Sequence, residues 1–585
     1  MELVYLWVED YKNIHNQGFN FSPRFTCDYD EDKNELTIDE NDDYIKDFFG
    51  KNINVTAIVG KNGSGKSNLL GLVLHPVAKK QFIIFTDNTY FYFSGIDENI
   101  FKISIEEMLK VRFKKIVLAT TISPLETLTT IYYNNVLSID YKEKYFPSSI
   151  GKYNKDISIS NRIYTANHLN IVRGEEKGFL DIYNQLNIAK SQNLQNIINL
   201  LQNQTINLPF SIPLSLKIEV KNFSFEDNKF INKFFPNLDM TFSFNSFSDY
   251  VRGAILNNFF AYKLSVSYVD KLEIREKIIE AFNQQTIEGF YIEISKIFLK
   301  EKLIKEENIT AQLNPYIDIF LKANQFLKLI DNLDIQSSQV QSVEIKDIAN
   351  DFINLYENVV GAGIEFLKFS FFHELSDGEE SFLSFFALLN EKKLLKYTDT
   401  TITNNIILLI DEGELTLHPD WQKKYIKYIV DFFKNNLPES TVHLVFATHS
   451  PFLLSDLPKE NIIFLEDGGE VFPFNKKEQT FGANIHTLLS HGFFMEDGLM
   501  GEFAKNKLNK IIKYLREDKI PEPTEAWVDS KENLKKTIEA IGETFLRHKV
   551  LELYYDKFTD DATKEERKKE LEKQKKQIES ELSKL

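Results

Sequence analysis

A single cysteine, Cys27, is all that this chain of 585 residues contains. One thiol cannot close a disulfide within the chain, and a chain without a disulfide framework suits a reducing cytosol. No window approaches 18 uninterrupted apolar residues, which argues against a membrane span. The first residues carry Glu2 and Glu9 where an export signal would carry positive charge. These absences predict a cytoplasmic protein that does not contact a membrane.

The chain also has fewer basic than acidic residues. The chain holds 69 lysines and arginines against 86 aspartates and glutamates, a formal net charge of −17. This balance argues against an extended nucleic-acid-binding surface on the chain alone. It leaves room for a local basic channel, or for one that forms when two copies meet. Part of the acidic excess lies in residues 28–43, which we expect to form a solvated hairpin or loop.

The order of apolar patterns predicts an α/β fold of several parts. A chain of this length with 43% apolar residues can bury a large core, divided among two to four domains. The predicted parts are a first head segment at 1–75, an antiparallel β subdomain at 76–164, a mostly helical insertion at 165–362, a second head segment at 363–480 and a helical C-terminal region at 481–585. The last part ends in a charged helix that is either solvated or docked on a partner or second subunit.

The stretch "GKNGSGKS" at 60–67 matches the pattern G-x-x-x-x-G-K-[ST] between a predicted strand and a predicted helix. Glycines there let backbone N–H groups wrap the α- and β-phosphates of a nucleotide, and the lysine reaches the β- and γ-phosphate oxygens. The serine hydroxyl suits Mg²⁺, so Ser67 is a predicted metal ligand and Lys66 a predicted catalytic residue. The predicted nucleotide-binding residues are Gly60, Asn62, Gly63, Ser64, Gly65, Lys66, Ser67 and Asn68.

Two further apolar runs end in polar residues. The run at 406–410 leads into Asp411 and Glu412, and is typical of a strand buried on both faces. Carboxylates at its end would lie at the edge where α/β sheets bind ligands. Asp411 is predicted to serve the Mg²⁺ site, and Glu412 to polarise the attacking water. The run at 442–447 repeats the pattern and places His449 where it could hydrogen-bond a γ-phosphate.

The stretch "HELSDGEES" at 373–381 predicts a second anion site. A serine and a glycine precede a helix start, where free N–H groups and the helix dipole face outward. Ser376 or Asp377 is also a suitable N-cap, which describes the local geometry equally well. The predicted ligand-binding residues of this turn are Ser376, Gly378 and Glu379.

In this order the four motifs resemble those of ABC-type ATPases, in the SMC-like and RecF-like branch rather than the transporters. The resemblance spans 1–75 and 363–470. It implies a P-loop ATPase head with a central, mostly parallel sheet, which hydrolyses ATP with Mg²⁺. It identifies 375–379 as the family signature, Asp411 and Glu412 as the Walker B carboxylates and His449 as the switch histidine. It also implies that Ser376 and Gly378 face ATP held by a second copy, in a head-to-head dimer or a higher oligomer.

Two positions depart from that family pattern. His418 stands where the family has its D-loop aspartate, a form associated with RecF-like defence ATPases and overcoming-lysogenization ATPases. The Q-loop glutamine has no firm counterpart, although Asn134 and Asn135 lie in a suitable part of the head. Coupling between the nucleotide and the insertion is therefore open, whereas nucleotide binding is not affected.

At finer grain, the start of the chain and residues 481–508 resemble the PtuA ATPases of Septu and retron-associated anti-phage systems. Those proteins assemble with a separate HNH nuclease, so the resemblance implies a sensor or scaffold whose nuclease lies on another polypeptide. Nucleic acid would then be reached through the complex.

Three alternatives remain at this point. A DNA-repair ATPase of the RecF/SMC kind shares the head, but 76–362 lacks the sustained heptads of an SMC arm. A self-sufficient ATPase-nuclease of the overcoming-lysogenization type needs a D-x-D beside a buried strand, and no such motif follows residue 470. A transporter subunit has neither a membrane span nor a compact length in its favour.

Overall fold

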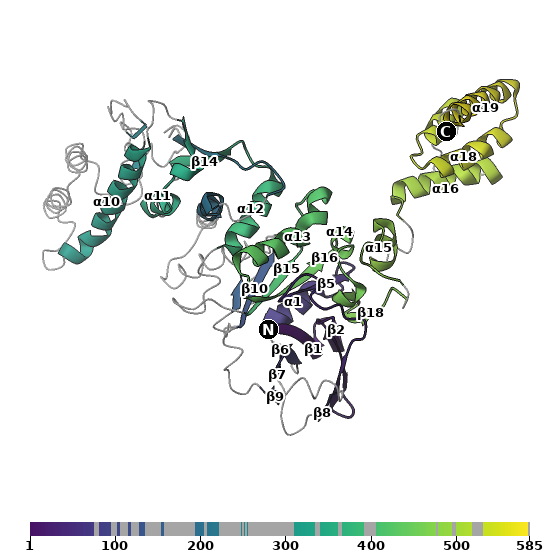
Figure 1. Cartoon of the computed structure of the whole chain (residues 1–585). Helices are drawn as coiled ribbons and strands as arrows, with labels where there is room; N and C mark the ends of the chain where they lie inside the picture. The colour runs from purple at the N-terminus through teal and green to yellow at the C-terminus, as the bar shows by residue number, and fades with distance from the viewer. Residues whose placement is uncertain are drawn as a thin grey trace. The chain divides into compact units, whose positions relative to one another are not determined.

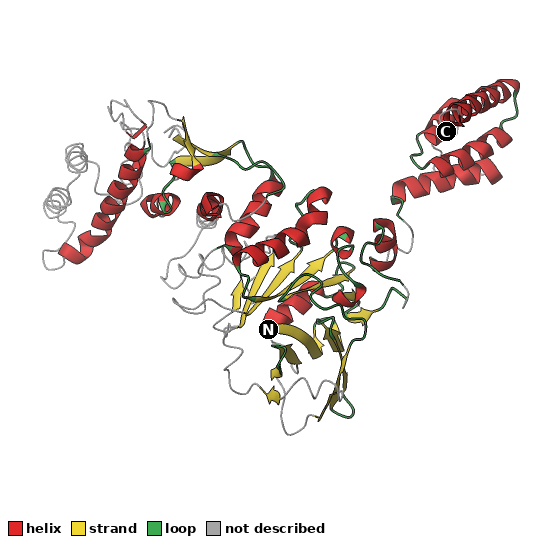
Figure 2. Ribbon diagram, viewed as in Figure 1, coloured by secondary structure: helices red, strands yellow, loops and turns green. Residues whose placement is uncertain are grey.

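The structure is a computed structural model of the chain (Figures 1 and 2). Residues 1–494 form one compact unit and residues 495–585 a second. The residues that the structure describes are 1–74, 81–94, 102–105, 115–118, 128–134, 154–156, 193–203, 208–220, 247–248, 251, 254–255, 309–333, 340–360, 366–390, 405–475, 478–493, 499–517 and 530–582.

A seven-stranded sheet lies at the centre of the first unit, in the order β11-β10-β15-β16-β5-β17-β18. Neighbouring strands from β11 to β17 run parallel, and only the last pair, β17 and β18, is antiparallel. The predicted α/β fold with a mostly parallel sheet is therefore confirmed. The strands are β5 (Ile53–Gly60), β10 (Leu128–Asn134), β11 (Asn154–Asp156), β15 (Asn405–Asp411), β16 (Thr441–Thr448), β17 (Ile462–Glu466) and β18 (Gly469–Val471).

Both faces of this sheet are buried, which explains the unbroken apolar runs of its strands. Ile406, Leu408 and Ile410 of β15 share one core with helices α12 (Asp377–Leu389) and α13 (Pro419–Asn436). Ile407 and Leu409 share a second core with helix α1 (Lys66–Leu74) and strand β1 (Glu2–Tyr11). Successive side chains of a strand point to opposite faces, so one sequence run serves two cores. Figure 2 shows the sheet with helices along it.

Strand β10 lies in the parallel sheet, although the sequence assigned 76–164 to an antiparallel subdomain. Ile131 of β10 lies opposite Leu408 of β15, and Asn134 lies opposite Asp411. An aromatic and β-branched run has the same pattern in either kind of sheet, so the pattern could not reveal its partner. Burial of Ile131 against the central sheet decides the pairing.

Two smaller sheets complete this part of the head. Their orders are β2-β1-β6-β7-β9 and β3-β4-β8. Most of these pairs are antiparallel, while β7 with β9 and β4 with β8 are parallel. The hairpin expected around 28–43 is the β3–β4 pair. The additional strands are β2 (Ile14–Asn20), β3 (Phe25–Asp30), β4 (Glu35–Glu40), β6 (Gln81–Thr86), β7 (Tyr90–Ser94), β8 (Lys102–Ile105) and β9 (Lys115–Leu118).

Most of the predicted insertion, 165–362, lies outside the described residues, and its helical character stays a prediction. In the part described, β12 and β13 pair antiparallel, and helices α10 and α11 pack on each other. β12 also pairs antiparallel with β14, which the sequence assigned to the second head segment at 363–480, so a strand of that segment completes a three-stranded sheet in the order β13-β12-β14. The elements are β12 (Ser215–Val220), α10 (Ile309–Asn332), β13 (Val340–Glu344), the 3-10 helix η6 (Ile345–Asp347), α11 (Phe352–Val360) and β14 (Leu367–Phe372).

Helix α15 (Ile485–Gly492) packs within the first unit, although the sequence placed it in the C-terminal region. A Cβ atom on Gly492 would lie 3.2 Å from a methyl carbon of Leu454 and 3.4 Å from the Phe464 ring. The short helix α14 (Pro451–Leu454) contacts α15, and the 3-10 helix η7 (Lys459–Asn461) contacts β5.

The second unit is helical, as predicted for the end of the chain. Ile511, Leu534, Ile538 and Val550 are among the residues of its own apolar core. Its helices are α16 (Glu502–Glu517), α17 (Lys531–Glu539), α18 (Thr544–Lys557) and α19 (Asp561–Leu582). Across the described part of the chain, no helix combines the length and apolar character that crossing a membrane requires.

Candidate functional site

The P-loop joins β5 to α1 at the carboxyl end of the central sheet, as the sequence predicts. Gly63 and Gly65 have φ angles of +82° and +107°. A residue with a Cβ atom is strained in this left-handed backbone conformation, whereas glycine adopts it freely. The loop therefore curls back on itself ahead of the free N–H groups of α1, where phosphate oxygens are favoured.

Lys66 is buried inside this loop, with 5% of its surface exposed. Its ammonium group donates to the carbonyl oxygens of Gly60 at 3.0 Å and Lys61 at 3.1 Å. Burial lowers the pKa of Lys66, and the nearby carboxylates of Glu412 and Asp411 oppose that shift. An ammonium held by two loop carbonyls can exchange them for phosphate oxygens with little movement, which is what the predicted role requires.

The turn between β1 and β2 supports the P-loop, which the sequence did not predict. Asn13 donates through Nδ2 to the Gly63 carbonyl oxygen at 3.1 Å and accepts from Asn68 Nδ2 at 2.9 Å. Lys12 donates to Asn68 Oδ1 at 2.9 Å. The sequence signal is only a two-residue turn between strands, and nothing local says which loop it contacts. Asn68, a predicted nucleotide-binding residue, is thus engaged in holding the loop.

Asp411 lies at the end of β15 with 2% of its surface exposed. Tyr132 of β10 donates its hydroxyl to Asp411 Oδ2 at 2.9 Å. Burial raises the pKa of Asp411, while hydrogen bonds from Ser67 and Tyr132 partly offset that effect. The structure thus places both predicted Mg²⁺ residues, Ser67 and Asp411, in contact with each other.

This donor set fits Mg²⁺ in a nucleotide site. No group of three or more His, Cys, Asp or Glu side chains that could hold a metal occurs within the described ranges. A nucleotide-bound Mg²⁺ needs no such group, because it takes one or two protein oxygens and completes its shell with phosphates and water. One hydroxyl and one carboxylate beside the P-loop meet that requirement.

Glu412 follows β15 in an unusual backbone conformation, with a φ angle of +52°. Its N–H still donates to the carbonyl oxygen of Ala447 at 2.9 Å, so the sheet pairing reaches this residue. A non-glycine residue with positive φ costs of order 1–3 kcal/mol and is frequent at functional sites. The strained backbone leaves the Glu412 side chain 29% exposed at the sheet edge, beside the site of Lys66.

His449 reaches the same place from the end of β16. Its Nε2 lies 3.5 Å from Glu412 Oε1, which is a close approach rather than a hydrogen bond. Burial, with a smaller contribution from Lys66, lowers the pKa of His449 to about 4. The imidazole is therefore neutral at pH 7, and the structure describes no hydrogen-bond partner for its buried Nε2. A phosphate oxygen or a bound water would supply one.

The signature residues occupy the start of α12. Ser376 is the N-cap, and its hydroxyl accepts from the Glu379 N–H at 3.4 Å. The Glu379 carboxylate returns to accept from the N–H and hydroxyl of Ser376, which completes a capping box. A Cβ on Gly378 would lie 3.0 Å from the Thr416 carbonyl oxygen, so α12 packs closely on the turn after Glu412. A residue larger than glycine would crowd the Thr416 carbonyl oxygen at this position.

His418, the departure from the D-loop pattern, caps helix α13. Its Nδ1 accepts from the N–H of Asp420 at 3.2 Å. Pro419 follows at the first position of that helix, where its missing N–H costs nothing. His418 and Pro419 therefore have a local structural explanation, as N-cap and first residue of α13, in addition to the one that the family resemblance implies for His418.

The fold and the site together define a P-loop ATPase: a phosphate loop, a buried acid, a second acid and a histidine meet at one edge of a parallel sheet. The profile of the AAA ATPase domain family matches residues 31–454, well over half of the chain. The chain belongs to this family. The matched range contains all the predicted site residues, from Gly60 to His449.

A curated relative from Escherichia coli carries the name "Retron Ec83 probable ATPase". It is 31% identical to this chain over 97 residues, which cover 16% of this chain and 17% of the relative. The match thus spans less than a fifth of that protein.

Replacement of Lys66 tests the nucleotide assignment. Lys66→Ala removes the one buried ammonium group of the loop, so we expect ATP affinity to fall about 10- to 100-fold, the effect of losing one charge-assisted hydrogen-bonding group. Titration with a fluorescent ATP analogue measures this change. Lys61→Ala is the matched control, because Lys61 lies in the same loop but is half exposed and pairs with Glu466 at 2.9 Å. Equal affinity of both variants and the wild type would contradict the assignment.

Proposed function

We propose that this chain is an ATP-binding and ATP-hydrolysing switch that controls a separate nuclease, of the HNH type, in anti-phage defence. The observation that carries the ATPase part is the convergence of Lys66, Asp411, Glu412 and His449 at one sheet edge. The defence part is supported by the family resemblance of the sequence and by the retron name of the relative.

Each group of the site has a defined task in this proposal. The P-loop N–H groups and Lys66 bind the phosphates of ATP. Ser67 and Asp411 would hold Mg²⁺, which when bound neutralises charge on the β- and γ-phosphates. Glu412 accepts a proton from the attacking water, since its carboxylate is partly exposed beside the loop. His449 is neutral, and its Nε2, which has no hydrogen-bond partner among the described groups, donates or accepts at the γ-phosphate.

The second anion site completes this arrangement from another copy of the chain. The start of α12 presents N–H groups and the positive end of a 13-residue helix. In the proposed dimer, Ser376 and Gly378 of one copy face the γ-phosphate held by Lys66 of the other, so two nucleotides are enclosed between two heads. A symmetric pair is the smallest assembly that satisfies both sites.

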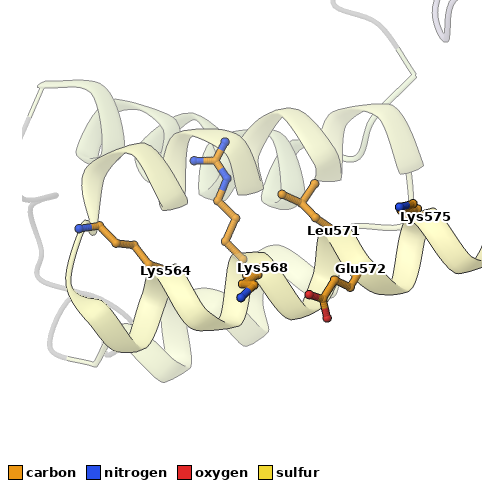
Figure 3. A pocket seen from close by; sticks show the side chains of 6 residues that line it. Lys564, Lys568, Leu571, Glu572 and Lys575 are labelled. Atoms are coloured by element: carbon orange, nitrogen blue, oxygen red, sulfur yellow. The ribbon is translucent and has the colours of Figure 1, made fainter.

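The C-terminal unit is the proposed contact region for a partner subunit. Phe503, Phe545 and Leu571 are 83%, 69% and 56% exposed, which is unusual for large apolar side chains. Lys564, Lys568 and Lys575 lie along α19 around Leu571 (Figure 3). Residues 495–585 hold 20 lysines and arginines against 21 aspartates and glutamates, although the whole chain has a net charge of −17. A nuclease subunit or its nucleic acid therefore meets less repulsion here than elsewhere on the chain.

Copurification with the products of neighbouring genes, followed by phage challenge, tests this function. We expect a stable complex with a nuclease, and protection that Lys66→Ala abolishes while Lys61→Ala preserves it. Absence of both a complex and a neighbouring nuclease gene would contradict the proposal. An ATP-dependent, salt-sensitive affinity for DNA without any effect on phage would instead indicate a DNA-repair ATPase of the RecF/SMC kind.

A further inference from the structure

A third carboxyl group, that of Glu414, is buried two residues after Glu412. It is 2% exposed, and none of the tasks described above uses it. Thr448, the last residue of β16, donates its hydroxyl to Glu414 Oε1. The N–H of Ser450 in turn donates to the Thr448 hydroxyl at 2.9 Å. The Glu414 side chain is therefore tied to both neighbours of His449 in sequence.

A second connection runs parallel to the first. The Ser450 hydroxyl donates to Gln422 Oε1 at 2.7 Å. Gln422 Nε2 donates to the carbonyl oxygens of Leu417 at 3.0 Å and Glu414 at 3.4 Å. The segment after β15 and the segment after β16 are thus joined through the side chain of Glu414 and, separately, through its carbonyl group.

These contacts involve residues close to Glu412 and His449 in the chain. Glu412 and Glu414 belong to one short turn, closed by the Leu415 N–H donating to the Glu412 carbonyl oxygen at 3.2 Å. His449 lies between the two residues that the Glu414 network holds, and its own N–H faces the Glu414 carboxyl group. A change at Glu414 would consequently alter the approach of His449 to Glu412, which is 3.5 Å in the structure.

Joining two loops through a buried carboxyl group costs free energy, because the group loses its hydration. Burial raises the pKa of Glu414 to about 7, so the site disfavours its charged form. Its second oxygen has no hydrogen-bond partner that the structure describes, and the same holds for the buried hydroxyl of Tyr425, whose charge interaction with Glu414 indicates that it lies near. Apolar residues would fill this volume without leaving polar atoms unpaired. Packing alone therefore does not explain an acid here.

We propose that Glu414 is a positioning residue for ATP hydrolysis, which holds the His449 segment against the turn of Glu412 and so sets the geometry of the two groups that act on water and γ-phosphate. This inference rests on the proposed ATPase function. Glu414 does not contact the P-loop ligands Lys66 and Ser67 in any described interaction, so its effect should fall on turnover and not on nucleotide binding.

Replacement of Glu414 separates positioning from mere packing. Glu414→Ala removes the acceptor for Thr448 and the His449 N–H, and we expect kcat to fall about 10- to 50-fold with the affinity for ATP unchanged within about threefold. Glu414→Gln keeps an oxygen that accepts from the same donors, so turnover should stay within about threefold of wild type. The measurements are kcat, the ATP dissociation constant and the melting temperature of each full-length variant.

The Thr448 side of the contact provides an independent pair of variants, which serves if Glu414→Ala does not fold. Thr448→Val deletes the hydroxyl and should lower kcat as Glu414→Ala does, while Thr448→Ser restores it. The double variant Glu414→Ala with Thr448→Val should turn over about as slowly as Glu414→Ala, because that single variant already lacks the hydrogen bond between Thr448 and Glu414.

Two results would overturn the inference. One is a melting temperature that falls in Glu414→Ala or Thr448→Val while kcat stays at the wild-type value, since that describes a purely structural role. The other is an equal loss of turnover in Glu414→Gln and Glu414→Ala, since a positioned acceptor is then not what matters. A wild-type chain that hydrolyses no ATP would instead overturn the proposed function itself, and is distinguishable from either.

Discussion

Glu412→Gln is expected to lower ATP turnover about 100- to 10,000-fold, the range for loss of a general base. The amide has the size of the carboxylate but cannot accept the proton of the attacking water. The positive φ angle of residue 412 and its N–H contact with Ala447 involve only the backbone, so the turn should persist in the variant. Steady-state phosphate release measures the rate.

Nucleotide binding should survive this substitution, because Lys66, Ser67 and Asp411 remain in place. We expect the ATP dissociation constant to stay within about threefold of wild type. Glu439→Gln is the matched control, since Glu439 is an exposed acid just ahead of β16 and should leave the rate unchanged. Hydrolysis by Glu412→Gln at the wild-type rate would show that the water is activated by another group.

Ser376→Arg is expected to abolish turnover while a single head still binds ATP. The arginine would place a long cation at the start of α12, where the proposed dimer brings the γ-phosphate of the second copy. Closure of the two heads would then be blocked sterically. Turnover below about a hundredth of wild type is expected, since water activation depends on a closed site. Light scattering with the Glu412→Gln background and ATP measures closure as dimer formation.

Loss of a helix cap must be separated from loss of the dimer. Ser376 closes a capping box, and removal of such a cap alone costs about 0.5–2 kcal/mol. Ser530 supplies the control, because it caps α17 by accepting from the Asn533 N–H and lies in the other unit. Ser530→Arg should preserve both dimer formation and turnover. Normal turnover in Ser376→Arg would contradict the proposed head-to-head dimer.

Both experiments address residues whose positions followed from local sequence patterns. The P-loop was predictable because Gly63, Gly65 and Lys66 form a contiguous motif with one backbone solution. Asp411, Glu412 and His449 were predictable as strand ends, because an apolar run that stops at a polar residue marks the edge of a parallel sheet. The capping box of Ser376 and Glu379 is likewise a four-residue pattern.

Other parts of the site depend on which segments meet. Tyr132 contacts Asp411 because β10 pairs with β15 in the central sheet, whereas its sequence pattern suited an antiparallel subdomain equally well. Asn13 supports the P-loop from a distant turn. From the sequence alone, Glu414 looks like one more acid in a surface turn. Its burial and its contact with Thr448 depend on the position of β16.

The sequence by itself determined the α/β class, the phosphate loop and the chemical groups available at the strand ends. Those features depend on short-range patterns, in which backbone geometry and burial periodicity constrain residues a few positions apart. The tertiary structure alone decided which strands are neighbours, which side chains support the loop and which acids are buried. These depend on contacts between residues far apart in the chain, and the pattern around each residue carries no record of its partner.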